Sequence, residues 1–356
     1  MTNSTTVLSL RDSPPSFASA FGGLRGLIET ATLLAERSVD CVLAIVVDGS
    51  PAAERKQGAM SVFSERGLQA GSLGGGALEQ ALHLAARSVL ADGRAKLVHF
   101  DTTNDGDDSG GSAKDTSIFL QLLILPMPAR SSPLRMAISR ACASSAWLRL
   151  RLELGARGQT LPEPGNGEAR IGSELFAFDN RGAAVEGPHS FLRHASLSIA
   201  PPPRLALLGC GAESMALVRQ AHLLGWYAEI VDARTDALAR ANEEQVDRVH
   251  ENPPRTLPDL LSERHFDAAV IGSQDFALDL AHLRELGTSG IGYIGLLGPP
   301  ERREALLAKV GDIAATQLEP RLYAPAGLSL GGEGPEVTAL AVIAQLQYYL
   351  THDAHA

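Results

Sequence analysis

A glycine-rich turn between an apolar strand and a helix constrains the fold of this chain more than any other feature. The segment 204–234 (RLALLGCGAESMALVRQAHLLGWYAEIVDAR) has the pattern of a strand, the turn Gly209-x-Gly211-x-x-Ser214, a helix, and a second strand that ends at Asp232. Gly209 permits the tight turn, Gly211 lets the backbone approach a phosphate, and Ser214 is small enough for close helix–sheet packing. We therefore expect a Rossmann-like domain from this part of the chain.

The same turn is a candidate binding site for a phosphate-bearing ligand. The helix that follows it exposes unpaired backbone N–H groups and the positive end of its dipole, so Gly209 and Gly211 would cradle an anion. Asp232 stands where an acidic side chain can accept hydrogen bonds from ribose hydroxyls. The alternative is a Rossmann turn that binds no ligand and serves only the fold.

A second glycine cluster precedes a helix in the N-terminal half. Gly74, Gly75 and Gly76 lead into the amphipathic segment Ala77–Leu90, and consecutive glycines before a helix can form an anion-binding nest. The cluster is no P-loop, because no Gly-Lys-Ser/Thr sequence follows it. The alternative is a plain flexible turn.

A third cluster, GLSLGGEGPE (327–336), precedes the last helix. Pro335 suits the first turn of a helix, and Glu336 would lie near its positive end. Glu336 is therefore a further candidate for a binding site, and the alternative is a helix start that is simply capped.

The remaining pattern predicts two α/β domains. Short apolar segments indicate strands, and amphipathic segments between them indicate helices. In the C-terminal part strands and helices alternate, which is typical of a parallel sheet. Pro201-Pro202-Pro203 forms a stiff linker. We expect an N-terminal α/β domain over 1–200, followed by a C-terminal Rossmann-like parallel-sheet domain over 201–356.

Composition excludes several classes of protein. The net charge of −10 argues against binding to nucleic acid or to anionic membranes. The sequence has no uninterrupted apolar run of 18 residues and no signal-peptide pattern at its start, so we expect no membrane span and no secretion. Three widely spaced cysteines suggest neither disulfides nor a zinc site and fit the cytoplasm. No nucleophile–base pair stands out, so we predict no catalytic and no metal-binding residues.

Several segments together resemble the XdhC/CoxI family, whose members are accessory proteins of molybdenum hydroxylases such as xanthine dehydrogenase. The resemblance covers most of the chain. It rests on the following segments: Gly49-Ser50, KQGAM (56–60), GSLGGGALE (71–79), the acidic loop 101–108, LLGCGAESMAL (207–217), IVDAR (230–234), DFALDLAHL (275–283), YIGLLG (293–298) and APAGLSLGGEGPE (324–336). The last three are the most specific. Glu79 and Arg234 lie within these motifs and join the candidate cofactor-binding residues.

The resemblance implies a function as well as a fold. A protein of this kind would bind molybdenum cofactor as cargo, either molybdopterin or its dinucleotide form, and deliver it to an apo molybdenum hydroxylase. It would act beside a cysteine desulfurase, self-associate into a homo-oligomer, and have no enzymatic activity of its own. Backbone donors in the two glycine turns suit the phosphate or pyrophosphate of such a cofactor.

The chain departs from the family pattern at four places. Ala77 and the segment Ser109–Ser112 stand where the family commonly has cysteines, which are suspected of contacting the molybdenum. Gln274 replaces a histidine, and Pro299 replaces a serine. Alanine and serine are poor ligands for a soft metal. We therefore expect binding through the pterin and phosphate, with little contact between protein and molybdenum.

Two other functions remain open at this point. The Rossmann turn also fits an NAD(P)-dependent oxidoreductase, although the sequence shows no convincing catalytic pair. The chain could instead be a degenerate scaffold that binds only its target enzyme.

Overall fold

The computed structural model describes most of the chain, and by its internal contacts the chain divides into two compact units. The described residues are 22–50, 57–101, 119–155, 163–234, 246–251 and 257–352. The first unit comprises Met1–Ser19, Gly26–Ser139 and Arg149–Ile199, and the second comprises Ala20–Arg25, Arg140–Leu148 and Ala200–Ala356.

The first unit is built on a five-stranded antiparallel sheet. Its strand order is β3-β2-β1-β5-β4. The strands are β1 (Cys41–Gly49), β2 (Met60–Ser64), β3 (Gly67–Gly71), β4 (Lys96–Asp101) and β5 (Phe119–Met127). Helix α2 (Ala77–Asp92) covers one face, because Leu78, Leu82, Ala86 and Val89 form an apolar stripe of helical spacing that packs into the core. Strands β2 and β3 form an antiparallel hairpin.

A smaller sheet completes the first unit. Its order is β8-β7-β6-β9, and its strands are β6 (Leu148–Glu153), β7 (Gly167–Ile171), β8 (Glu174–Phe178) and β9 (His194–Ile199). Strands β7 and β8 form a hairpin, because Gly172 takes a positive φ of 55° and reverses the chain. Helices α1 (Gly23–Glu36) and α3 (Pro133–Ser144) contribute residues to both units.

The second unit is a Rossmann domain with a six-stranded, wholly parallel sheet. The strand order is β12-β11-β10-β13-β14-β15. The strands are β10 (Arg204–Leu208), β11 (Tyr227–Asp232), β12 (Arg248–Glu251), β13 (Ala268–Ile271), β14 (Tyr293–Leu296) and β15 (Leu322–Tyr323). The parallel sheet predicted from alternating strands and helices is confirmed, and β12 and β15 are additional strands that the sequence did not reveal.

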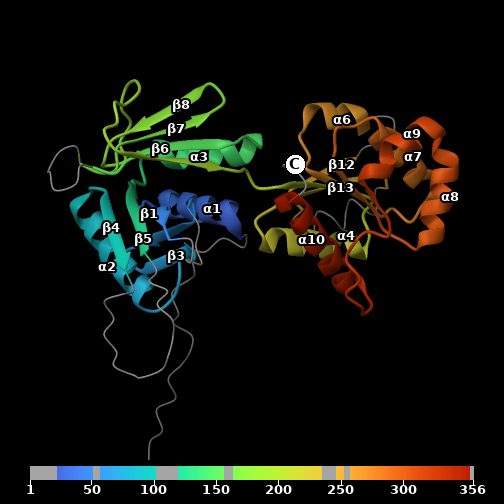
Figure 1. Ribbon diagram of the computed structural model, residues 1–356, viewed down its shortest axis with the longest axis horizontal. Helices are drawn as coiled ribbons and strands as arrows, with labels where there is room; N and C mark the ends of the chain where they lie inside the picture. The colour runs from blue at the N-terminus through green and yellow to red at the C-terminus, as the bar shows by residue number, and fades with distance from the viewer. Residues whose placement is uncertain are drawn as a thin grey trace, which may run out of the picture. The chain divides into compact units, whose positions relative to one another are not determined.

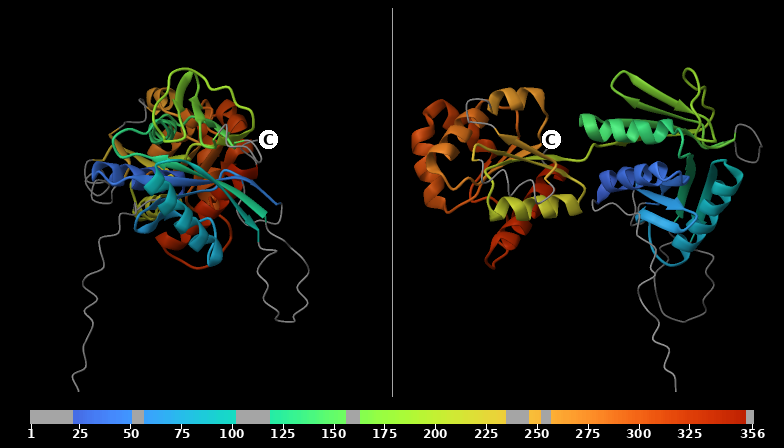
Figure 2. Two further views of the ribbon diagram at one scale, coloured as in Figure 1. Left: turned by 90° about the vertical axis from the view of Figure 1, so that its left-hand side faces the viewer. Right: turned by 180° about the vertical axis from the view of Figure 1, so that it is seen from behind.

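Helices cover both faces of this sheet (Figure 1). The helices are α4 (Ala212–Leu223), α6 (Leu257–Glu263), α7 (Phe276–Gly287), α8 (Pro300–Val310), α9 (Asp312–Leu318) and α10 (Pro335–His352), with a short 3₁₀ turn at Glu319–Arg321. Helices α4 and α10 pack on one face, and α6 to α9 pack on the other, each against its own apolar core. Figure 2 shows α4 and α10 together from the opposite side.

The second unit also contains a segment from near the start of the chain. The Arg25 guanidinium donates to the carbonyl oxygen of Trp226 at 3.0 Å and pairs with Asp247 at 2.5 Å. It also lies 4.3 Å from the ring centre of Tyr227. The backbone N–H of Gly22 donates to the carbonyl of His222. This segment therefore belongs to the second unit by its hydrogen bonds as well as by its contacts.

Within the described residues, no helix is long and apolar enough to cross a membrane.

Candidate functional site

The glycine turn after β10 has the geometry that its sequence predicted. Gly209 adopts φ 110°, and its N–H donates to the carbonyl of Val231 at 2.9 Å. Ser214 is buried, and its hydroxyl donates to the Gly209 carbonyl at 2.7 Å. The third position of the motif therefore closes the turn by a hydrogen bond that glycine could not make.

Gly211 ends the turn and precedes the first residue of α4. Its φ of −126° is open to any residue, so backbone conformation does not require glycine here. A Cβ at this position would have only the Glu213 carboxylate at 3.3 Å and the Gly272 carbonyl at 3.9 Å nearby. The glycine therefore leaves open space beside the helix N-terminus, where unpaired N–H groups are available to a ligand.

A pocket of about 320 Å³ opens beside this turn, and it joins residues that are distant in sequence. Its lining comes from the start of α4 and the start of α10: Cys210, Gly211, Ala212, Met215, Arg219, Pro335 and Glu336. The candidates Gly211 and Glu336 thus meet in one cavity. Because both helices begin there, their dipoles favour a negatively charged ligand.

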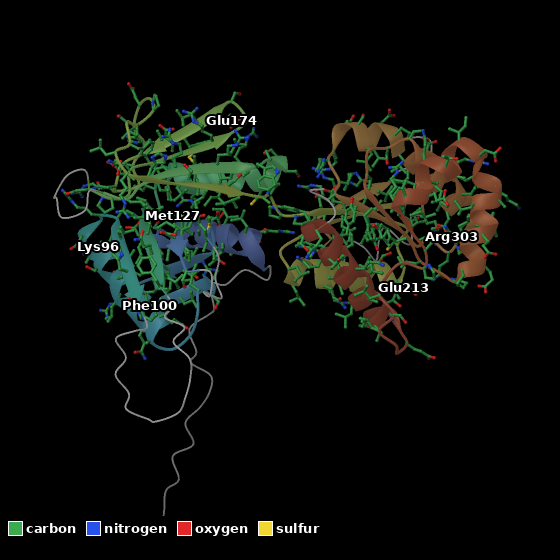
Figure 3. The ribbon with its side chains drawn as sticks, in the orientation of Figure 1. Lys96, Phe100, Met127, Glu174, Glu213 and Arg303 are labelled. Atoms are coloured by element: carbon green, nitrogen blue, oxygen red, sulfur yellow. The ribbon has the colours of Figure 1, made fainter. Side chains whose placement is uncertain are left out.

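Charged side chains of both signs lie at the pocket. Arg219 and Glu336 face each other with 3.4 Å between Nη2 and Oε1, and both are largely exposed. Exposed pairs of this kind contribute little stability, so Arg219 can exchange partners at low cost. Glu213 lies on the first turn of α4 (Figure 3). Its carboxylate opposes an incoming anion.

The loop that carries α10 is fixed by one amide side chain. Gln345 Oε1 accepts hydrogen bonds from the Gly327 N–H at 2.8 Å and from the Tyr293 hydroxyl at 2.6 Å. Tyr293 is fully buried and stacks on Tyr323 at 4.3 Å. The start of α10, and with it one wall of the pocket, is therefore anchored to the sheet.

Asp232 ends β11 beside the glycine turn, which confirms the spacing predicted from the sequence. Its buried carboxylate accepts hydrogen bonds from the Cys210 N–H at 2.8 Å and from the backbone and guanidinium of Arg234 at 2.7–3.0 Å. Burial alone would raise the pKa of Asp232, but the hydrogen bonds from Arg234 and Cys210 lower it. The carboxylate is therefore ionised and engaged at neutral pH.

The loop after β13 carries a second buried charge network. Asp279 accepts the Ser273 hydroxyl at 2.5 Å and pairs with the Arg302 guanidinium at 2.7 Å. His282 is buried one turn further along α7, and its Nδ1 has no hydrogen-bond partner among the described residues. Burial lowers the pKa of His282, against smaller opposing effects from Asp279 and Asp232, so the ring is neutral near pH 7.

The glycine cluster of the first unit forms an exposed turn. Gly74 and Gly76 have positive φ values of 144° and 61°, and Gly76 immediately precedes α2. A Cβ on Gly75 or Gly76 would meet no atom within 4 Å. Glu79 lies in the first turn of α2. The exposed start of α2 therefore has glycine backbone that is suited to an anion-binding nest, and the acidic Glu79 lies beside it.

The structure describes three of the four positions at which the chain departs from the pattern of the family that it resembles. Ala77 is the exposed first residue of α2. Gln274 adopts φ 62°, in the left-handed region, between β13 and α7. Pro299 caps α8. Ser109–Ser112 and the acidic loop beyond Asp101 lie outside the described residues.

Sequence reasoning singled out Gly211, Pro335 and Glu336 but missed four residues of the pocket: Cys210, Ala212, Met215 and Arg219. A signal was present, because residues 211, 215 and 219 are spaced by four and share one face of a helix. The sequence could not show that this face meets the start of α10.

The fold and the pocket define a two-unit α/β protein with a Rossmann domain whose glycine turn lines a cavity at the start of two helices. Residues 205–346 match the XdhC Rossmann domain, and residues 34–101 match the XdhC and CoxI family. The chain belongs to the XdhC and CoxI family.

Relatives and solved structures agree with this placement. The chain is 24% identical over 323 residues to a Bacillus subtilis protein named as a probable xanthine dehydrogenase subunit, covering 88% of this chain and 94% of that protein. It is 30% identical over 155 residues to the uncharacterized protein YqeB of Escherichia coli, covering 40% of this chain but only 27% of YqeB. A crystal structure of a xanthine dehydrogenase from Bacillus halodurans superposes with a TM-score of 0.71 at 25% identity, covering 92% and 96% of the two chains.

Proposed function

We propose that this protein is an accessory factor of a xanthine dehydrogenase-type molybdenum hydroxylase. In this role it binds the molybdenum cofactor as cargo, protects it, and delivers it to the apo hydroxylase, without catalysing a reaction itself. Family membership and the xanthine dehydrogenase names of its relatives support the accessory role. A cysteine desulfurase, self-association and a cytoplasmic location belong to the same proposal.

The observation that carries cofactor binding is the pocket where α4 and α10 begin. Molybdopterin has a pterin ring system and a phosphate. The pocket offers two helix N-termini and the Arg219 guanidinium to the phosphate, and the thioether of Met215 and the ring of Pro335 to the flat ring system. Gly211 leaves the space through which the phosphate would approach the backbone.

An NAD(P)-dependent oxidoreductase is a weaker alternative. Such an enzyme binds the ribose of its cofactor through an acidic residue at the end of the second strand. Here Asp232 is buried and already accepts hydrogen bonds from Cys210 and Arg234. The carboxylate must lose these partners before it can bind a ribose, so the geometry favours a different ligand.

Binding of a fluorescent, oxidised pterin that carries a phosphomonoester tests the proposal. We expect micromolar affinity in the unmodified protein and at least a tenfold loss in Arg219→Ala, because the guanidinium is a charge-assisted donor to phosphate. The matched control is Arg303→Ala, since Arg303 lies on α8 in the other helical layer of the same unit (Figure 3).

A transfer assay completes the test. Protein loaded with molybdenum cofactor is incubated with an apo molybdenum hydroxylase, and the recovered hydroxylase activity is measured. We expect recovery that Gly211→Val reduces, because a branched side chain fills the phosphate approach. Failure of the unmodified protein to bind either the phosphomonoester or the dinucleotide form of the pterin would leave a scaffold that binds only the target enzyme.

A further inference from the structure

We infer that the second unit selects a phosphomonoester form of the pterin and rejects a dinucleotide form, with the Asp232–Arg234 pair as the specificity-determining element. This inference rests on the proposed function and adds the chemical form of the ligand. Three features of the structure support it: the hydrogen bonds of Asp232, the engagement of the Cys210 N–H in one of them, and the volume of the pocket.

The first feature is the saturation of the Asp232 carboxylate. Oδ1 accepts the Arg234 backbone N–H at 2.9 Å and the Arg234 Nε–H at 3.0 Å. Oδ2 accepts the Arg234 Nη2–H at 2.7 Å and the Cys210 N–H at 2.8 Å. A carboxylate has about four acceptor positions, and all four are filled. With 1% exposure, Asp232 has no free acceptor for the two hydroxyls of a ribose.

The ion pair between Asp232 and Arg234 is also energetically favoured over a contact between Asp232 and a ribose. A bidentate Arg–carboxylate contact is among the stronger side-chain interactions, particularly when one partner is buried. Asp232 is buried, whereas the Arg234 side chain is 44% exposed. Removing the guanidinium without a replacement would leave a buried carboxylate with two backbone donors only. A ribose would have to replace charge-assisted hydrogen bonds with neutral ones.

The second feature concerns the donors of the glycine turn. The Cys210 N–H points to Asp232 and is not available to a phosphate. The N–H groups in the first turns of α4 and α10 remain at the pocket, and Arg219 Nη2 lies 3.4 Å from Glu336 Oε1. A pyrophosphate that runs past the glycine turn therefore meets one backbone donor fewer at that turn.

The third feature is the size of the pocket. Sites for small molecules have volumes of about 300 to 1,000 Å³, and this pocket, at about 320 Å³, lies at the lower end. Pro335 and Glu336 belong to its lining together with the glycine turn. One phosphorylated ring system would fill such a cavity, and the added nucleotide would lie outside it. There it would lack the ribose contact that an acidic residue at the end of the second strand provides in dinucleotide-binding domains.

Three fluorescent probes test the inference: an oxidised pterin with a phosphomonoester, the same pterin joined through a pyrophosphate to cytidine, and the same pterin without phosphate. Dissociation constants are measured for the full chain. We expect the phosphomonoester to bind at least tenfold tighter than either of the other probes. In Arg234→Ala, which releases Asp232 for a ribose, we expect the ratio between the dinucleotide and phosphomonoester constants to fall severalfold.

Each outcome decides a different point. Equal or tighter binding of the dinucleotide would overturn the inference while leaving the proposed function intact. Binding of no probe would overturn the proposed function itself. A preference for the phosphomonoester that Arg234→Ala leaves unchanged would overturn the role of the Asp232–Arg234 pair. Circular dichroism verifies that the Arg234→Ala variant is folded. Arg303→Ala is the control for loss of an arginine outside the pocket.

Discussion

The Cα of Ser273 lies 2.5 Å from the point that a Cβ on Gly209 would occupy, and the Ser273 nitrogen lies 2.6 Å from it. Because β10 and β13 are neighbours in the sheet, the loops that follow them run in backbone contact. Gly209 also adopts a positive φ of 110°. Space and conformation therefore both require glycine at this position.

We expect Gly209→Ala to lower the free energy of unfolding by roughly 2–4 kcal/mol, from backbone strain and a displaced loop. Urea unfolding followed by tryptophan fluorescence measures this change, because both tryptophans, Trp147 and Trp226, belong to the second unit. The control is Gly290→Ala, where a Cβ would meet no atom within 4 Å. A similar effect of both substitutions would contradict the steric argument.

Glu213→Gln should strengthen binding of the phosphorylated pterin by roughly three- to tenfold, because a negative charge leaves the phosphate approach beside Gly211. The same substitution should cost at most about 1 kcal/mol of stability through the helix dipole. Fluorescence titration at low and high salt measures the effect, and the gain should shrink with salt. Glu304→Gln, on the exposed face of α8, is the charge-matched control. Unchanged affinity in Glu213→Gln would place the phosphate elsewhere.

The pH dependence of stability should reveal the buried Glu229. Burial alone would raise its pKa, but hydrogen bonds from His250, Arg264 and Arg204 outweigh burial and hold the pKa at about 2. Because the folded pKa lies below the unfolded value of about 4.3, the ionised group stabilises the fold above roughly pH 5. This contribution, roughly 3 kcal/mol, is lost as pH falls toward 2.

The variant Glu229→Gln isolates that contribution. At pH 7 it should lose about 3–5 kcal/mol, because two arginines keep their charge and lose their carboxylate. The difference from the unmodified protein should narrow between pH 5 and pH 3. Urea midpoints at a series of pH values measure it, with Glu304→Gln as control. A difference that does not vary with pH would show that Glu229 acts through packing alone.

Cys41 should resist alkylation in the folded protein. It is 1% exposed, and burial raises its pKa to about 12, against a smaller opposing effect of Arg135. The reactive thiolate is therefore scarce at pH 8. Iodoacetamide labelling and mass spectrometry should find Cys41 unmodified in native protein and modified in urea. Rapid native labelling would show that β1 opens frequently.

The sequence predicted the Rossmann unit well because local rules determine it. The strand–turn–helix–strand order and the place of Asp232 follow from spacing along one continuous segment. The edge strands were missed for an equally physical reason. β12 (Arg248–Glu251) has a single apolar residue, Val249, and β15 (Leu322–Tyr323) has two residues, so neither carries a periodic signal.

The candidate site was harder to predict than the fold, because its chemistry depends on tertiary contacts. The sequence predicts Asp232 as a ribose ligand, but its spacing did not reveal the ion pair with Arg234, two residues away. Glu229 gave no sign of its role until the structure surrounded it with three basic side chains from distant elements. Such pairings depend on rotamers and packing, which a single sequence does not specify.

The contact of Arg25 with Trp226 and Asp247 has a consequence for how such proteins can be recombined. Arg25 is encoded before the sheets of the first unit. The rest of the second unit, to which Arg25 belongs, is encoded mainly after Pro203. An exchange of the C-terminal stretch alone would pair Asp247 with whatever residue the recipient carries at position 25. Recombinants between relatives should therefore function best when both stretches come from one parent.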